Sequence, residues 1–240
     1  MKNQFKPILY LGAAVILLVI TVFAIINYRA GLPQAPAPVF ETIDNARANS
    51  YWPILGGIEI KEGDLIIGSD KADLKIFVYE DYSSHLSATL ADTLNQLNQE
   101  NKGRLAIVAR PFILSGSSLS QEAALAYACA LEENKGEEMR AKLFTLAKEN
   151  NFSALAVLEE ARNLKINEEK FQACLTNQEK LLKLEEGMIE ARANLVLGAP
   201  TMFVGDEMIL GARPYSDFVD SNGDAIEGLK TVVDRKLGGL

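Results

Sequence analysis

Two cysteines and a single histidine are the residues of this chain best suited to carry chemistry. Cys129 and Cys174 stand far apart, and neither belongs to a Cys-x-x-Cys pair, which is the spacing that redox dithiols use. These residues leave three interpretations open: a structural disulfide, two separate buried thiols, or a reactive pair. The cysteines by themselves therefore indicate no redox centre.

The histidine, His85, directly follows Ser84, which suggests a serine nucleophile with a histidine as its base. Adjacent residues at the start of a helix generally point in different directions, however, and no third residue is identifiable that would orient His85. We therefore interpret Ser84 as an ordinary helix cap. His85 is expected to be exposed or to contact a partner.

Two acidic stretches could suggest a metal site. Residues 220–224 begin like a calcium loop, but the sixth and twelfth positions are Ala225 and Thr231, where glycine and glutamate are required. The glutamates between positions 132 and 138 have no histidine near them, so they are better explained as the solvated ends of two helices. We predict a polar turn and helix cap at residues 220–224, and no metal or cofactor.

The composition is that of an acidic chain with room for one globular domain. The chain has 240 residues, a net charge of -8 and an isoelectric point near 4.9. Lysines and arginines are interleaved with acidic residues, so we expect no basic face that would neutralise a phosphate backbone. Nucleic acid is therefore not predicted as a partner.

Residues 8–26 form an uncharged apolar stretch. Its length of about nineteen residues is enough to cross the hydrocarbon core of a bilayer as a helix. Lys2 and Lys6 precede it, so the positive-inside rule predicts a cytoplasmic stub and membrane anchor over residues 1–28, with everything beyond on the periplasmic or extracellular face. A cleaved signal peptide is the alternative, although its apolar region would normally be shorter. Residues 29–57 start with a proline- and alanine-rich spacer and are expected to link the anchor to the domain.

The next elements form a predicted strand-helix-strand unit. Residues 74–79 and 105–114 are apolar runs typical of buried strands, and between them leucines recur at helical spacing. Ser83 or Ser84 can cap this helix, and Gly103 ends it. Such a unit should be parallel and right-handed. A short alternation at residues 58–60 could add an edge strand.

The rest of the chain is predicted to be a helical block, a hairpin and a last helix. Residues 118–196 are helical in pattern, with a capping box at Ser118, a break at Gly136, and further caps at Ser153 and Asn167. Strand character returns at residues 201–204 and 208–210 around a Gly-Asp turn, and a helix over residues 224–236 follows.

This order of elements, together with two motifs, resembles the DsbA-like thioredoxin family over residues 66–237. That family carries a Cys-x-x-Cys after its first buried strand, and here residues 78–87 read VYEDYSSHLS, which places Ser84 and Ser87 at the two cysteine positions. Gly198-Ala199-Pro200-Thr201 is similar to the family's cis-proline loop, and residues 202–218 resemble the hairpin that follows it. The resemblance implies an α/β thioredoxin-like fold over residues 58–240, in which the helical block of residues 118–196 is an insertion.

The resemblance also implies the position of a site and its loss of redox chemistry. Pro200 is expected to be cis and to face the helix start, where Ser84, His85 and Ser87 would line a peptide-binding surface together with Ala199 and Pro200. Serine cannot replace a thiolate or form a disulfide, so we expect a redox-inactive module that binds or scaffolds an extracytoplasmic protein or peptide. Relatives often carry a structural bridge in the helical insertion, which favours a disulfide between the chain's two cysteines.

Other functions of the same fold remain open at this point. A thiol-disulfide oxidoreductase would have to act through Cys129 and Cys174, which are expected to lie away from the peptide-binding surface. Glutathione-dependent transferases and isomerases of this fold use a serine near the helix start to hold the thiolate of glutathione. The predicted anchor argues against that function, because it places the domain outside the cytoplasm.

Overall fold

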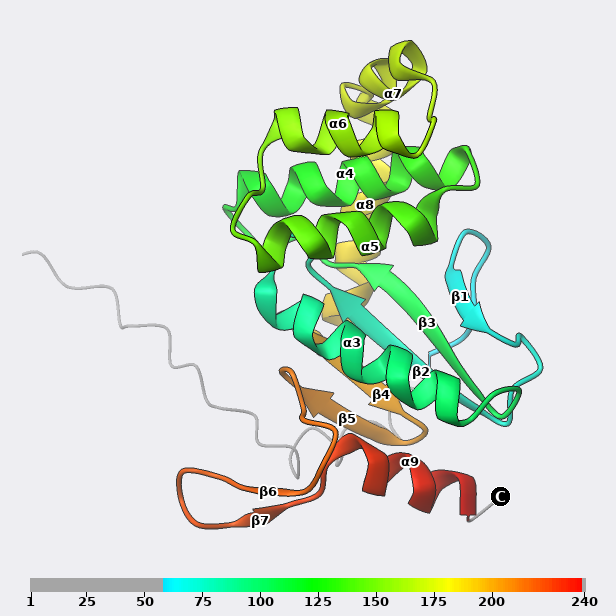
Figure 1. Cartoon of the computed structure of the whole chain (residues 1–240), viewed down its shortest axis with the longest axis vertical. Coiled ribbons are helices and arrows are strands. Elements are labelled where there is room, and N and C mark those ends of the chain that lie inside the picture. The colour runs from blue at the N-terminus through cyan, green and yellow to red at the C-terminus, as the bar shows by residue number, and fades with distance from the viewer. Residues whose placement is uncertain (1–57, 239–240) are drawn as a thin grey trace, which may run out of the picture. The chain divides into compact units, whose positions relative to one another are not determined.

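The computed structural model describes residues 58–238 of the chain (Figure 1). The predicted stub and anchor, residues 1–28 with their apolar stretch 8–26, lie outside the described residues, as does the predicted linker, residues 29–57. Among the helices between residues 58 and 238, none has both the length and the apolar character needed to cross a membrane. The described residues, 58–238, form the folded domain.

A five-stranded mixed sheet forms the centre of the domain, in the order β1-β3-β2-β4-β5. The two central strands, β2 and β3, are parallel, and every other pairing is antiparallel. The parallel pair and the helix between them are the predicted strand-helix-strand unit. The strands are β1 (Leu65–Gly68), β2 (Leu74–Glu80), β3 (Leu105–Pro111), β4 (Thr201–Val204) and β5 (Glu207–Leu210).

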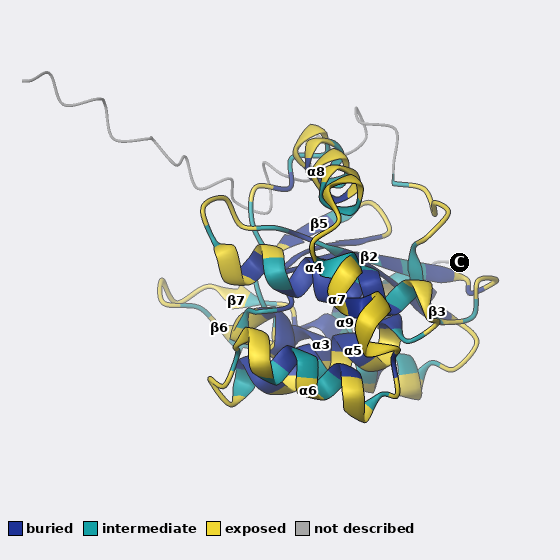
Figure 2. Cartoon of the chain, turned by 90° about the horizontal axis from the view of Figure 1, so that it is seen from above, coloured by how far each residue is buried: buried dark blue, intermediate teal, exposed yellow. Residues whose placement is uncertain are grey.

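Helices cover both faces of the sheet because successive strand side chains point to opposite faces. Ile76 and Val78 of β2 pack in the cluster that holds the apolar residues of α3 (His85–Glu100) and α9 (Leu229–Gly238). Tyr79, on the other face of β2, packs in a cluster with residues of α8 (Gln178–Ala193). Figures 1 and 2 show α3 and α8 on opposite sides of the sheet. Strands buried on both faces explain the nearly continuous apolar runs of the sequence.

The predicted helical insertion is present; apart from α8, which covers a face of the sheet, its helices lie at one end of the sheet (Figure 1). Its core includes Ala88 and Ala91 of α3, so the insertion packs directly on the first helix of the domain. Ser153 and Asn167 cap helices as predicted, whereas the first helix is capped by Ser117, one residue before the predicted Ser118. The five helices are α4 (Ser118–Glu132), α5 (Gly136–Lys148), α6 (Ala154–Asn163), α7 (Glu168–Leu175) and α8.

The predicted edge strand at residues 58–60 is wrong, because the edge strand is β1. The carbonyl of Glu59 accepts a hydrogen bond from Arg110 Nη2 at 2.6 Å instead of one from a neighbouring strand. The same guanidinium donates to both carboxylate oxygens of Asp64, at 2.7 and 2.8 Å. A side chain of β3 therefore holds the segment before β1, and the ladder begins only at Leu65.

Two predicted boundaries also differ, whereas the predicted break at Gly136 is confirmed, because α4 ends at Glu132 and α5 begins at Gly136. The second strand ends at Pro111 and not at residue 114. The last helix starts at Leu229, because residues 218–226 form a two-stranded hairpin of β6 (Phe218–Val219) and β7 (Ala225–Ile226). Asp220 stabilises the turn of this hairpin by accepting hydrogen bonds from two amides and caps no helix.

Candidate functional site

Ser84 stands at the start of α3 and caps it as predicted. Its backbone is extended, with φ -94° and ψ 127°, and its hydroxyl oxygen accepts a hydrogen bond from the Ser87 amide at 3.4 Å. The Ser84 amide donates to the carbonyl of Asp81 at 3.0 Å, which shapes the loop between β2 and α3. The Ser84 side chain thus satisfies one of the amides that a helix start leaves unpaired.

Ser87 is buried, so the prediction that it lines the peptide-binding surface is wrong. Its exposed fraction is 0%, and its hydroxyl oxygen accepts a hydrogen bond from the Asp81 amide at 3.2 Å. The Asp81 carboxylate accepts in turn from the amide and hydroxyl of Ser83, at 2.9 and 2.7 Å. Ser87 points inward because it shares the face of α3 with Ala91, which packs against the helical insertion.

His85 is exposed, as one of its two predicted alternatives required. Its Nδ1 atom lies 3.4 Å from the hydroxyl of Thr89, one turn further along α3, and that hydroxyl donates to the His85 carbonyl at 2.9 Å. Within residues 58–238, no hydrogen bond joins His85 to Ser84. The arrangement provides no serine nucleophile with a histidine base.

A buried ion pair lies immediately before the helix start and was not predicted. Arg140 of α5 donates two hydrogen bonds to the Glu80 carboxylate, at 2.6 and 2.7 Å, and both side chains are at most 3% exposed. The guanidinium also lies 4.9 Å from the ring centre of Phe144. Burial opposes the charge of Arg140, but Glu80 raises the pKa of the guanidinium above its ordinary value. The pair connects the end of β2 to the helical insertion.

Two buried tyrosines extend this contact. The rings of Tyr82, in the loop before α3, and Tyr127 of α4 have their centres 4.7 Å apart. In the part of the chain that the structure describes, neither hydroxyl has a hydrogen-bond partner. Burial raises the pKa of both phenols above 10.0, because an apolar environment disfavours the charged form. The contact between the two rings therefore holds the loop that carries Ser84 against α4.

The loop before β4 brings Ala199 and Pro200 to the same edge of the sheet. The peptide bond between them is cis, and β4 pairs antiparallel with β2 so that Thr201 lies opposite Tyr79. By this register Pro200 is beside the end of β2, from which the chain leads to Ser84. Pro200 is buried, so it cannot line an exposed surface as predicted, whereas Ala199 is half-buried.

Part of the backbone of this loop has no hydrogen-bond partner among residues 58–238. The Pro200 carbonyl accepts a hydrogen bond from the Gly211 amide at 2.9 Å, and the Gly198 carbonyl accepts from the Thr201 hydroxyl at 2.8 Å. No hydrogen bond among residues 58–238 uses the amide or the carbonyl of Ala199. Ala199 thus offers both a donor and an acceptor to an approaching chain.

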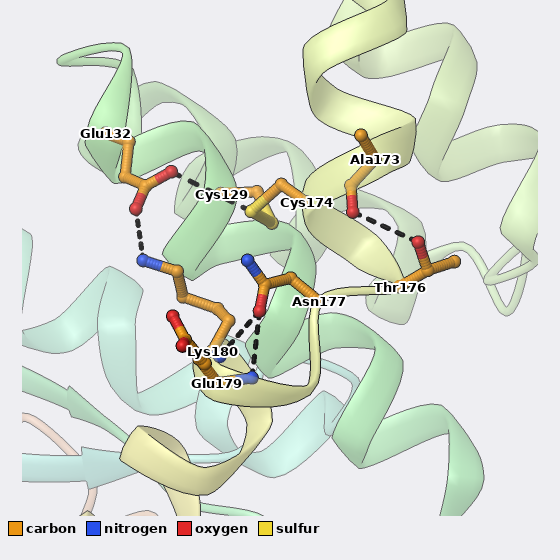
Figure 3. The surroundings of a disulfide bond; sticks show 8 residues. All are labelled: Cys129, Glu132, Ala173, Cys174, Thr176, Asn177, Glu179 and Lys180. Atoms are coloured by element: carbon orange, nitrogen blue, oxygen red, sulfur yellow. Dashed lines mark hydrogen bonds and ion pairs between the residues drawn. A yellow bond between two sulfur atoms is a disulfide. The ribbon is translucent and has the colours of Figure 1, made fainter.

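The two cysteines form the predicted disulfide, far along the helical insertion from the helix start. Cys129 of α4 and Cys174 of α7 are joined with an S–S distance of 2.04 Å. Figure 3 shows the bridge beside Glu132, whose carboxylate lies 3.9 Å from Cys174 Sγ and pairs with Lys180. Asn177, in the same view, caps α8. Because the chain has only these two cysteines, no free thiol remains.

Comparison with known proteins identifies the fold. A family model described as Thioredoxin matches residues 61–221. None of the curated proteins gives a significant match to the sequence. Solved structures that are similar to this chain at less than 25% identity show the fold alone.

Three of these structures illustrate the likeness. The thiol-disulfide exchange protein alpha-DsbA2 from Wolbachia pipientis has a TM-score of 0.62 and 19% identity, with 80% of this chain and 96% of that chain covered. The catalytic domain of Proteus mirabilis ScsC has a TM-score of 0.59 and 17% identity, covering 80% of this chain and 98% of that one. A thioredoxin-like oxidoreductase from Silicibacter pomeroyi DSS-3 has a TM-score of 0.57 and 21% identity, covering 73% and 92%. The predicted DsbA-like fold, an α/β thioredoxin-like sheet with a helical insertion, is confirmed.

Proposed function

This chain belongs to the thioredoxin family, and from that premise we propose that its domain binds an extended peptide segment of another protein at Ala199 and carries out no disulfide exchange there. One observation carries the proposal. At the edge where the loop before β4 meets the start of α3, the hydroxyls of Ser84 and Ser87 are engaged within the domain, while the Ala199 backbone is open.

The loss of exchange chemistry follows from the atoms at the helix start. Disulfide exchange needs a thiolate, which a helix start stabilises, and a second thiol within reach to resolve the mixed disulfide. Ser84 and Ser87 supply hydroxyls instead, and serine has no accessible anion near neutral pH without a partner base. The disulfide between Cys129 and Cys174 uses both cysteines of the chain elsewhere. These facts support a binding function over an enzymatic one.

Binding of an extended peptide requires no sulfur. The backbone of such a peptide forms hydrogen bonds with exposed main-chain groups, which supply affinity, and its side chains enter neighbouring pockets, which supply specificity. Ala199 offers one donor and one acceptor for this pairing. Ser84 and His85 are accessible at the same edge, whereas the buried Ser87 and Pro200 would shape the surface without touching the peptide.

We further propose that the domain works outside the cytoplasm, held at the membrane by residues 8–26. Two observations support this location. The apolar stretch is long enough to span a bilayer, and the disulfide between Cys129 and Cys174 is of the kind that persists in oxidising compartments. Protease treatment of intact spheroplasts should digest the domain, while a domain that survives until the membrane is broken would contradict this orientation.

A photo-crosslinking amino acid in place of Ala199 tests the binding function in the native membrane. We expect it to capture a polypeptide, and mass spectrometry of the crosslinked peptide should identify an extended segment. The matched control carries the same amino acid at Leu155 of α6, an apolar residue that is 70% exposed. It should not capture the polypeptide that is captured at position 199. Equal capture at both positions, or none at Ala199, would rule out the proposal.

An insulin-reduction assay addresses the competing oxidoreductase function. The wild-type chain should give no turnover above background, because its two cysteines are joined to each other. Turnover comparable to that of a thioredoxin-fold enzyme with an intact dithiol would overturn the redox-inactive assignment, whatever the crosslinking result.

A further inference from the structure

A cavity of about 550 Å³ opens between the loop that follows β3 and the helix α8. Its apolar walls are Ile113 and Leu114 from the loop and Met188 and Ile189 from the helix. Ligand pockets are commonly concave and mainly apolar, with a few polar groups that orient the ligand. The cavity therefore has the size and the apolar character of a ligand site, with room for a large apolar side chain.

The cavity and Ala199 border the same apolar cluster. Ala199 and the cavity-lining Ile113 both pack against the cluster that contains Met188, which also lines the cavity. The Ile113 amide donates to Met188 Sδ at 3.0 Å, which fixes the loop to α8 beside the cavity. An extended peptide paired with Ala199 could run along this cluster toward the cavity, advancing by about 3.3 Å per residue.

The apolar walls reach the surface. Leu114 is 37% exposed and Ile189 is 67% exposed. Exposed apolar residues that gather at one place are typical of an interaction site.

The polar part of the wall has a positive end. Arg192 lines the cavity from the last turn of α8, is exposed, and has no ion-pair partner among residues 58–238. Ser117 and Ser118, across from α8, form the start of α4, whose first turn contains no acidic residue. Helix starts carry a partial positive charge. The acidic member of the wall, Glu185, is seven residues before Arg192, so it lies two helical turns away from this end.

We infer that the cavity receives a large apolar side chain of the bound peptide and that an acidic side chain of the same peptide pairs with Arg192. This inference rests on the proposed peptide-binding function and specifies its ligand: an extended segment that combines an apolar and an acidic residue. Two observations carry it: the exposed Arg192 at the cavity has no ion-pair partner among residues 58–238, and the cavity and Ala199 border one apolar cluster.

Selection from a phage-displayed library of random heptapeptides on the purified full-length chain tests the inference. Peptides selected on the wild type should share a large apolar residue with an Asp or Glu within two positions. Arg192→Glu should lower the affinity of such a peptide by roughly five- to tenfold, and a fresh selection on this variant should favour lysine or arginine at the acidic position. Ile189→Ser should lower the affinity by roughly fivefold, because it removes part of the apolar wall.

The matched control is Lys183→Glu, which makes the same kind of charge reversal at an exposed residue of the same helix that lines a different cavity. Its affinity and its selected peptides should equal those of the wild type. This inference would be overturned by selected peptides that crosslink at Ala199 but show no preference for an apolar and an acidic residue. A preference that does not change with Arg192→Glu would overturn it too. Either outcome would leave the binding function intact. A wild-type chain that selects no peptide would overturn both.

Discussion

The Ser87 hydroxyl oxygen accepts a hydrogen bond from the Asp81 amide at 3.2 Å, and its side chain has no exposed surface. This contact ties the first turn of α3 back to the end of β2. It shows that the inner of the two serines is built into the domain as a structural residue, one turn beyond the half-buried Ser84. The hydroxyl oxygens of these two serines therefore serve to cap the helix start and to hold it against the preceding loop.

Restoring the sulfurs should restore exchange chemistry. The double variant Ser84→Cys with Ser87→Cys is expected to form a disulfide within the first turn of α3 and to reduce insulin, because the helix start lowers the pKa of a cysteine at position 84. The single variant Ser84→Cys is the control and should form mixed disulfides without turnover, since it has no resolving thiol. A folded double variant without activity would show that further features of the site are missing.

Removing the disulfide should weaken the helical insertion selectively. The double variant Cys129→Ala with Cys174→Ala is expected to lose about 3 to 4 kcal/mol of unfolding free energy, because the bridge closes a loop with a sequence separation of 45. Urea denaturation measures this loss. Hydrogen exchange should increase first in α7, whose only buried residue is Phe171. A loss below about 1 kcal/mol would contradict this role of the bridge.

Removing one partner of the ion pair between Glu80 and Arg140 should lower the stability of the domain more than replacing both partners. Arg140→Met is expected to destabilise the domain by about 3 to 5 kcal/mol, since it leaves the buried Glu80 carboxylate without its partner. Adding Glu80→Gln should recover part of that loss, because the remaining amide carries no charge. Thermal or urea unfolding of the two variants gives the comparison. Equal stability of the single and double variants would argue that the charge of Glu80 is not the cause.

The buried tyrosines predict a loss of stability in alkali. Burial raises the pKa of Tyr82 and Tyr127 above 10.0 in the folded domain, whereas the unfolded chain has tyrosines of ordinary pKa. Their contribution is fully present below about pH 10 and is lost above it, because the unfolded state then releases protons that the folded state retains. Urea titrations at about pH 8 and about pH 10.5 should show this decline.

Tyr127→Phe removes the hydroxyl group and keeps the aromatic ring, so it tests the hydroxyl alone. It should raise stability by about 1 kcal/mol near neutral pH, because it removes a buried hydroxyl without a partner among residues 58–238, and it should flatten the alkaline decline. Tyr82→Phe should act in the same direction. Parallel stability profiles for wild type and both variants between about pH 8 and about pH 10.5 would exclude this explanation.

Local patterns in the sequence were enough to predict the main elements. Apolar runs predict the central strands, leucines at helical spacing predict α3, and short polar residues predict the caps at Ser84, Ser153 and Asn167. The serines at positions 84 and 87, and the loop with Pro200, could be assigned from motifs, because each motif is a short run of neighbouring residues. The disulfide was expected from the resemblance, because relatives often carry a structural bridge in the helical insertion, whereas the two cysteines alone left its formation open.

Tertiary packing decided what those residues can reach. Whether Ser87 is accessible depends on the helical insertion that packs on α3, and the pairing of Glu80 with Arg140 joins residues that are 60 positions apart. The displacement of the edge strand from residues 58–60 to β1 depends on Arg110, a side chain from another strand. The cavity at Arg192 exists only because α8 lies beside the loop after β3. Sequence patterns report the neighbours of a residue along the chain, whereas burial, ion pairing and cavities depend on contacts between distant segments.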